Sequence, residues 1–191
     1  MRVKTKRMLL ALLIMLVCVS ATNDTTLTTT PQPETEKKTL VYQFAIRQDI
    51  MPAIWRQTKQ SMEEAKRLKA DYIIIHMNTY GGLVNMADSI RTVILNSGIP
   101  VFVFIDNNAA SAGALISVAC DSIYMRKGAS IGAATVVNQT GEQMSDKYQS
   151  YMRSIMRATA QAHGKDTLIQ GNDTIIKWRR NPSIAEAMVD P

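Results

Sequence analysis

A serine in a run of small residues is the side chain of this sequence best suited to nucleophilic chemistry. The run reads NAASAG at positions 108–113, with Ser111 in fourth place, and it follows an apolar stretch. A second turn, Gly81-Gly82, follows another apolar stretch. The carboxyl ends of neighbouring strands in an open α/β sheet line the ligand crevice, so we expect both turns at one edge of a sheet.

Backbone amides at these two turns can stabilise an oxyanion. Glycine permits positive φ and lets the backbone approach a substrate closely. We therefore expect the amides of Gly81 and Ala112 to point at one oxygen, helped by a helix N-terminus at Ser111. Ser111 is the predicted nucleophile of such a site, where removing one amide donor typically costs roughly a hundred- to a thousandfold in rate.

A serine nucleophile needs a general base, and a lysine is better placed for this role than either histidine. His76 falls inside a strand and His163 at the end of a long helix, 143–163. Lys147 is predicted to lie on the apolar stripe of that helix, where loss of water contact favours the neutral amine and makes lysine a base. Ser–Lys pairs are an established variant of the catalytic triad. The predicted stripe consists of Met144, Tyr148, Tyr151, Met152, Ile155 and Thr159.

Each of these features also has a purely structural explanation. A serine in such a run commonly caps a helix or allows close packing. A lysine beside an apolar stripe can extend its amine to water, and Gly81-Gly82 alone is only a turn. The order of the features favours catalysis, because two turns after apolar strands are followed by a lysine on the expected apolar face.

The surrounding sequence predicts alternating strands and helices. Helical segments carry apolar residues three and four apart, and strands are short apolar runs. This alternation indicates an α/β fold of repeated strand–helix units with right-handed crossovers. Strands are predicted at 40–46, 71–77, 101–105 and 122–125, and helices from 52, at 85–96 and at 143–163, with further helical segments at 167–177 and 181–189.

Residues 1–21 are predicted to form a secretory signal. A basic stretch at 1–7 precedes an apolar run at 8–19, which is too short to make a good membrane-spanning helix, and cleavage is expected after Ala21. An uncleaved N-terminal anchor is the alternative. Lipidation at Cys18 is disfavoured because the two residues before it are bulky.

The next segment, 22–39, is rich in Thr and Pro and is predicted to be a flexible linker, which leaves 40–191 as the folded domain. The chain therefore is expected to act outside the cytoplasm.

Composition argues against several other classes of protein. The net charge of +6 arises largely from four basic residues before position 8, so the domain gives no reason to expect nucleic-acid binding. Loss of the signal leaves Cys120 as the only cysteine, which excludes an intramolecular disulfide. Two histidines and one cysteine without ligand spacing predict no metal site, and no phosphate-binding glycine motif is present, so no cofactor is expected.

The segment 78–82, the run 107–113 and Lys147 resemble the protease domain of NfeD-type membrane-bound serine proteases. That domain is similar in fold to Clp proteases and, more distantly, to crotonases. The resemblance covers roughly 40–190, and the NAASAG block is its most specific part. It implies a Clp/crotonase-like fold. It also implies a serine endopeptidase with Ser111 as nucleophile and Lys147 as general base, oxyanion amides from Gly81 and Ala112, and substrate contacts at Tyr80 and Gly82.

The resemblance further implies a substrate class and an assembly. The family cleaves apolar segments of membrane-associated proteins, stomatin-type proteins among them, and its protease domains form dimers or larger assemblies. Full-length members continue into transmembrane helices and a small β-barrel, whereas this chain stops at Pro191, so we expect a protease domain that lacks its C-terminal end. Tyr80 stands where the family commonly has proline, which alters the substrate edge without removing a catalytic amide.

Two other functions are consistent with the residues. A non-catalytic module derived from this fold would bind proteins or peptides without cutting them. A crotonase-like acyl-CoA enzyme would use the same oxyanion hole, but the export signal argues against it because acyl-CoA is an intracellular substrate.

Overall fold

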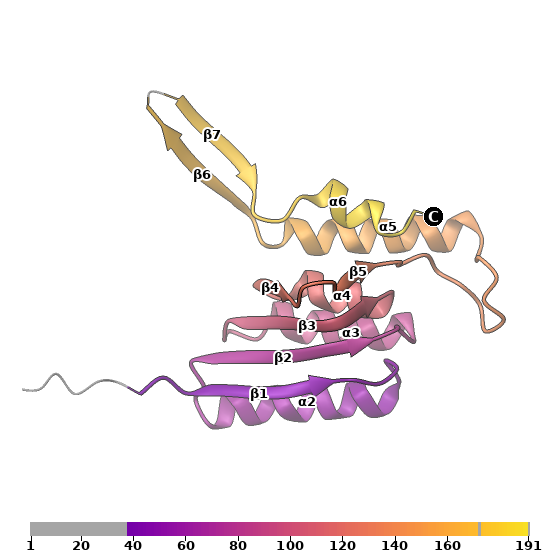
Figure 1. Ribbon diagram of the computed structural model, residues 1–191, viewed down its shortest axis with the longest axis horizontal. Helices are drawn as coiled ribbons and strands as arrows, with labels where there is room; N and C mark the ends of the chain where they lie inside the picture. The colour runs from indigo at the N-terminus through magenta and orange to yellow at the C-terminus, as the bar shows by residue number, and fades with distance from the viewer. Residues whose placement is uncertain (1–37, 172, 191) are drawn as a thin grey trace, which may run out of the picture. The chain divides into compact units, whose positions relative to one another are not determined.

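The computed structural model describes residues 38–171 and 173–190. The predicted signal, 1–21, and nearly all of the predicted linker, 22–39, lie outside the described residues. Five parallel strands form the central sheet, in the order β1-β2-β3-β4 with β5 paired to β3 (Figure 1). These strands are β1 (Val41–Ile46), β2 (Tyr72–Thr79), β3 (Val101–Ala110), β4 (Ser122–Met125) and β5 (Ser130–Gly132).

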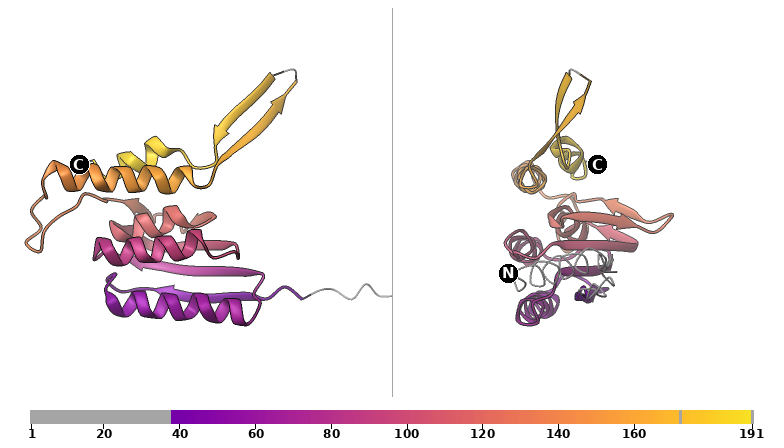
Figure 2. Two further views of the ribbon diagram at one scale, coloured as in Figure 1. Left: turned by 180° about the vertical axis from the view of Figure 1, so that it is seen from behind. Right: turned by 90° about the vertical axis from the view of Figure 1, so that its left-hand side faces the viewer.

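Three helices cover one face of this sheet (Figure 2). They are α2 (Pro52–Arg67), α3 (Val84–Leu95) and α4 (Ala112–Ala119). Alternate strand residues such as Ile73, Ile75 and Met77 point under these helices and are fully buried. The strand–helix alternation confirms the α/β fold predicted from the sequence.

The opposite face of the sheet carries aromatic side chains. The rings of Tyr72 and Phe102 stack with their centroids 5.5 Å apart, and His76 lies 5.5 Å from Phe104. Tyr124 meets the edge of Phe102 at 6.2 Å. These rings cover one another on a face that the three helices leave open in Figure 2.

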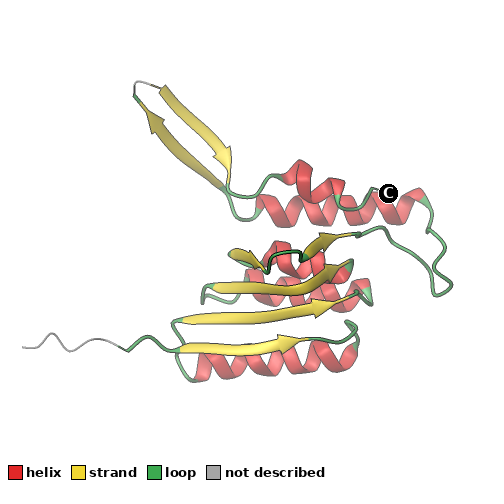
Figure 3. Cartoon of the chain, viewed as in Figure 1, coloured by secondary structure: helices red, strands yellow, loops and turns green. Residues whose placement is uncertain are grey.

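The segment predicted as a helix at 167–177 is a β-hairpin instead (Figure 3). It consists of β6 (Lys165–Gln170) and β7 (Asp173–Trp178), paired antiparallel. The prediction was wrong because Gly171, at φ +63°, forms the turn between two β-branched runs, whereas a helix would need it at its centre. Ile169 and Ile176 remain 77% and 63% exposed on the hairpin.

Two further helices follow the sheet in sequence, α5 (Asp146–Gln161) and α6 (Pro182–Ala187). Proline at the first position of α6 and Asn181 at its N-cap, whose side chain accepts from the Ser183 amide, explain where this helix begins. No helix in the described ranges is both long enough and apolar enough to cross a bilayer.

A polar cluster caps the C-terminal end of α4. Nη1 of Arg180 donates to the carbonyl oxygens of Val118 and Cys120, the latter at 2.7 Å. Nε2 of His163 lies 2.8 Å from the Val118 oxygen and 3.0 Å from that same Arg180 nitrogen. Burial lowers the pKa of His163; the hydrogen bond to the Val118 carbonyl opposes this in part, and the charge of Arg180 adds to the lowering. The folded protein therefore disfavours the imidazolium form.

This cluster predicts an acid-sensitive stability. The unfolded chain binds a proton at His163 more readily than the folded chain, so stability falls as the pH drops below the ordinary histidine value of about 6.5. Thermal unfolding of wild type and His163→Gln at pH 7.5 and 5.5 measures this loss of stability at the lower pH. We expect the variant to lose less stability than wild type over that interval. Equal losses in wild type and His163→Gln would show that His163 does not contribute.

Candidate active site

Ser111 has an unusual backbone conformation between β3 and α4. Its φ is +52° and its ψ −116°, a region that non-glycine residues rarely occupy. Only two other non-glycine residues of the described chain have positive φ, Lys69 and Ala133, and Ala133 lines the same cavity as Ser111. Such strain costs on the order of 1–3 kcal/mol per residue and clusters at functional sites.

Pairing of β3 on both sides holds this strained turn in place. The strand predicted to end at 105 continues instead to Ala110, where β3 pairs with β5. The Ser111 amide donates to the Gly132 carbonyl at 2.8 Å, and the Ser111 carbonyl accepts from Ala114 at 2.9 Å. The sharp passage from strand to helix thus presents the serine at the head of α4, as in other nucleophile turns.

The Ser111 hydroxyl does not cap α4. Ser111 occupies the N-cap position, but its side chain makes no capping hydrogen bond. The helix-capping explanation for this serine is therefore wrong, and Oγ is left available for chemistry.

The Gly81-Gly82 turn lies directly against Ser111, which confirms that the two turns meet at one edge of the sheet. A Cβ placed on Gly81 would lie 2.7 Å from Cβ and 3.2 Å from Oγ of Ser111. Gly81 has φ +124° and Gly82 has φ +146°. Only glycine combines this conformation with so close an approach.

The structure favours the Gly82 amide of this turn, and not the expected Gly81 amide, as the oxyanion donor. The Gly81 N–H donates to Oγ1 of Thr79 at 3.2 Å, so it is already engaged. The Gly81 carbonyl accepts from the Ile50 amide at 2.7 Å. The N–H and C=O of a trans peptide point in opposite directions, so the Gly82 N–H points away from Ile50. Because β2 lies between β1 and β3, that is the side on which Ser111 lies.

A cavity of about 520 Å³ opens around Ser111. Both predicted substrate-contact residues, Tyr80 and Gly82, line it, and among the described residues of its lining Tyr80 is the only one with an ionisable side chain. The other lining residues are Leu83, Ala110, Ala133, Thr135, Val137, Asn138 and Gln139.

A second cavity, of about 710 Å³, shares Val137, Asn138 and Gln139 with the first. Its lining is mainly apolar and includes Tyr148 and Tyr151 of α5, which are half exposed. The two cavities together form an open, largely apolar groove that runs from Ser111 to α5.

Lys147 does not lie where the sequence placed it. It is exposed in the first turn of α5 and lines neither cavity. The predicted stripe was right at Met152 and Thr159, which are buried, and wrong at Tyr148 and Tyr151, which are half exposed and line the second cavity. The buried residues of the helix are Gln149, Met152, Met156, Thr159 and Ala160.

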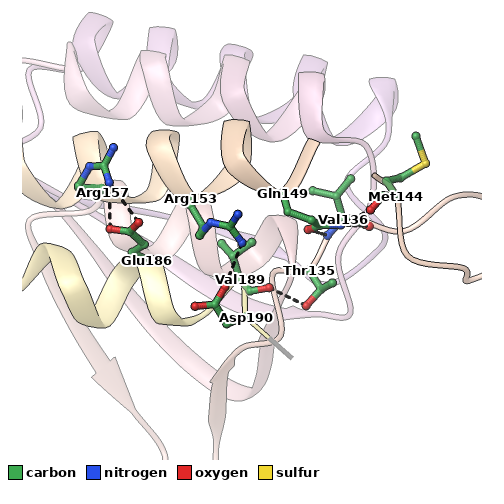
Figure 4. Close-up of polar contacts among 9 residues, drawn as sticks. All are labelled: Thr135, Val136, Met144, Gln149, Arg153, Arg157, Glu186, Val189 and Asp190. Atoms are coloured by element: carbon green, nitrogen blue, oxygen red, sulfur yellow. Dashed lines mark hydrogen bonds and ion pairs between the residues drawn. The ribbon is translucent and has the colours of Figure 1, made fainter. Parts of the chain in front are cut away.

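Gln149 is buried in spite of its polarity because the backbone satisfies its amide. Oε1 accepts from the Val136 amide at 2.9 Å, and Nε2 donates to the carbonyls of Val136 and Met144 at 2.8 and 3.1 Å (Figure 4). Val136 lies between two residues that line the Ser111 cavity. Gln149 therefore joins the wall of the site to α5.

The C-terminal segment holds the same wall from its other side. The Ala134 amide donates to the Met188 carbonyl at 2.7 Å, and Oγ1 of Thr135 donates to the Val189 carbonyl at 2.8 Å. Ion pairs then join the segment to α5 (Figure 4). They are Arg153–Asp190 and Arg157–Glu186, both at 3.1 Å.

Other chemistries find little support in the described residues. Burial raises the pKa of the Cys120 thiol to about 12, which keeps it from acting as a thiolate nucleophile. No three His, Cys, Asp or Glu side chains of the described segments gather into a potential metal site.

Because Gly81 lies so close to Ser111, we expect a methyl group at position 81 to destabilise the folded protein strongly. Gly81→Ala combines an unfavourable φ with an overlap at Ser111, and we expect it to lower the free energy of unfolding by about 2–4 kcal/mol. Gly98→Ala is the matched control, since Gly98 has φ +70° but nothing within 4 Å, and should lose only about 1–2 kcal/mol. Urea denaturation measures both. Equal losses would mean that Gly81 is not in tight contact.

Comparison with known proteins places this chain in a family. The family described as "NfeD1b, N-terminal domain" matches residues 40–173. The membrane protein NfeD1b of Bacillus subtilis is 34% identical over 156 residues, which is 82% of this chain. The membrane-bound protease PH1510 of Pyrococcus horikoshii is 29% identical over 140 residues, 69% of this chain. The chain spans about a third of the length of each relative, 32% in both cases.

Solved structures show the same fold. A lysine-to-alanine variant of 1510-N, a membrane-bound stomatin-specific protease, in complex with a substrate peptide has a TM-score of 0.68 and 27% identity, covering 81% of this chain and 67% of that one. A serine-to-alanine variant of 1510-N also has a TM-score of 0.68 and 27% identity, covering 80% of this chain and 70% of that one. ClpP1 from Listeria monocytogenes has a TM-score of 0.58 at 18% identity, covering 78% of this chain and 79% of that one. The fold is thus Clp protease-like, and the chain belongs to the NfeD1b N-terminal domain family.

Proposed function

We propose that this domain is a serine endopeptidase whose nucleophile is Ser111. The strained conformation of Ser111 at the head of α4, with its hydroxyl free of a capping bond and facing Gly81, carries this proposal. The similarity to proteins described as membrane-bound proteases supports it.

In the proposed reaction, Oγ of Ser111 attacks the carbonyl carbon of the scissile peptide and its proton passes to the neutral amine of Lys147. The oxyanion accepts hydrogen bonds from the amides of Ala112, an unpaired N–H of the first turn of α4, and Gly82. Collapse of the tetrahedral intermediate breaks the C–N bond, and the proton moves from Lys147 to the leaving amine. Water then hydrolyses the acyl-enzyme by the same steps.

Lys147 is the proposed base even though it lies outside the cavity in this conformation. Its helix begins directly after the segment 133–145, part of which lines the Ser111 cavity. A shift of this segment on substrate binding is the step that would bring the amine to Ser111. The lysine-to-alanine and serine-to-alanine variants among the similar structures are consistent with such a pair.

The apolar groove supports a substrate that is an extended, apolar peptide segment. Leu83 and Val137 near Ser111, and Tyr148 and Tyr151 farther along, offer surface for large apolar side chains. A segment of a membrane-associated protein fits this chemistry, and the stomatin specificity of 1510-N makes a stomatin-type protein the proposed partner. We further propose that the domain acts as a homo-oligomer.

Export is proposed from the sequence of residues 1–21. Expression of the whole chain with its N-terminus intact, followed by mass spectrometry of the product in the extracytoplasmic fraction, tests this. We expect the mature chain to begin at Thr22. Retention of an intact Met1 in the cytoplasm would contradict it.

Non-catalytic peptide binding is the second candidate. The exposure of Lys147, together with a Ser111 cavity whose described lining offers only Tyr80 as an ionisable group, favours this alternative. The two candidates differ in whether a peptide leaves the groove cut or intact.

Substitution of the proposed dyad separates these candidates. With residues 22–191 and a set of apolar peptides, Ser111→Ala and Lys147→Ala are each expected to lower kcat by at least roughly 10⁴-fold, because dyad members act as a unit. Ser154→Ala and Lys127→Ala change exposed residues away from the groove and should cleave like wild type. Cleavage by Ser111→Ala at the wild-type rate would contradict the proposal, and peptide binding without cleavage in the wild type would favour the second candidate.

A further inference from the structure

Thr79, the last residue of β2, is a buried polar side chain that the reaction described above does not use. Only 2% of its surface is exposed, and it lies two residues before the glycine that touches Ser111.

The hydroxyl of Thr79 connects two segments. Oγ1 donates its proton to the Gln48 carbonyl at 2.8 Å, in the segment after β1, and accepts the Gly81 N–H at 3.2 Å. A hydroxyl has one proton and two lone pairs, so both bonds can form at once. Together with the Ile50–Gly81 bond, they hold Gly81 at both its N–H and its C=O.

The methyl group of Thr79 makes the second contact. A Cβ placed on Gly113 would lie 2.6 Å from Cγ2 of Thr79. Gly113 is the second residue of α4, directly after the Ala112 amide. One side chain thus touches both turns that supply the proposed oxyanion donors.

We propose that Thr79 is a positioning residue of the Ser111 site. Its hydroxyl keeps the Gly81 N–H turned away from Ser111. Because Gly81 is held at both its N–H and its C=O, the Gly82 N–H, which points opposite to the Gly81 carbonyl, is aimed at the oxyanion. Its methyl sets the distance between this peptide and the start of α4. The inference rests on the proposed peptidase function for its kinetic consequence, but the hydrogen-bond geometry can be measured without it.

Two substitutions separate the hydroxyl from the methyl group. Thr79→Val keeps the methyl contact with Gly113 and removes both hydrogen bonds. Thr79→Ser keeps the hydrogen bonds and removes the methyl. We expect Thr79→Val to lower kcat about tenfold with KM unchanged, less than the hundred- to thousandfold typical of deleting an oxyanion donor, because the donor remains but is no longer held. Thr79→Ser should keep kcat within about threefold of wild type.

Rates are normalised to the folded fraction, so a stability loss alone cannot produce the kcat effect. A kcat of Thr79→Val equal to that of wild type would overturn the proposal. A kcat for Thr79→Ser as low as that for Thr79→Val would also overturn it, because the methyl packing at Gly113, and not the hydrogen bonds, would then explain the loss.

Hydrogen exchange of glycine amides gives a readout that needs no catalysis. In protein labelled with ¹⁵N-glycine, we expect the Gly81 amide to exchange at least about tenfold faster in Thr79→Val than in wild type or Thr79→Ser, because its acceptor is gone. Gly98, with nothing within 4 Å of its Cβ position, serves as internal reference. Unchanged Gly81 exchange overturns the positioning role. If no Ser111-dependent cleavage is found but the exchange pattern holds, the peptidase function fails and the geometry of Thr79 stands.

Discussion

Parallel pairing of β3 on both of its sides is the constraint on which the site depends. β2 pairs along one edge, with a register irregularity between Ile105 and Ala109, and β4 and then β5 pair along the other, so the strand continues as far as Ala110. The chain must then turn into α4 within one residue, and Ser111 takes a backbone conformation that costs energy. The Ser111–Gly132 hydrogen bond and the close packing of Gly81 retain this turn, and the Ser111 hydroxyl is presented without being used as a cap.

The α/β fold and the meeting of the two turns followed from sequence because both depend on short-range patterns. Apolar runs such as 71–77 and 101–105 mark buried strands, and parallel strands must bring their carboxyl ends to one edge. The position of Lys147 did not follow, because hydrophobic periodicity treats tyrosine as core and glutamine as surface. Here backbone hydrogen bonds bury Gln149, while Tyr148 and Tyr151 face a groove. The direction of the Gly81 amide depends on a bond to Thr79 that no spacing rule contains.

The wall of the groove is held by segments far apart in the chain. Gln149 binds it from α5, and Met188 and Val189 bind it from the C-terminal segment, which two ion pairs fasten to α5. A displacement of α5 would therefore move the wall and Lys147 together. In the proposed dyad, this linkage is the physical route by which a bound peptide, or a contact made by the C-terminal segment, would bring Lys147 toward Ser111.

The most direct test of the account is the chemical reactivity of Ser111. Folded protein spanning residues 22–191 would be treated with a diphenyl phosphonate ester of an apolar amino acid, which forms a covalent adduct with activated serines, and the adduct mapped by peptide mass spectrometry. We expect a single adduct on Ser111 that is absent from Ser111→Ala and from unfolded protein. No adduct on Ser111, or adducts spread over the exposed serines, would contradict the claim that the fold makes this serine a nucleophile.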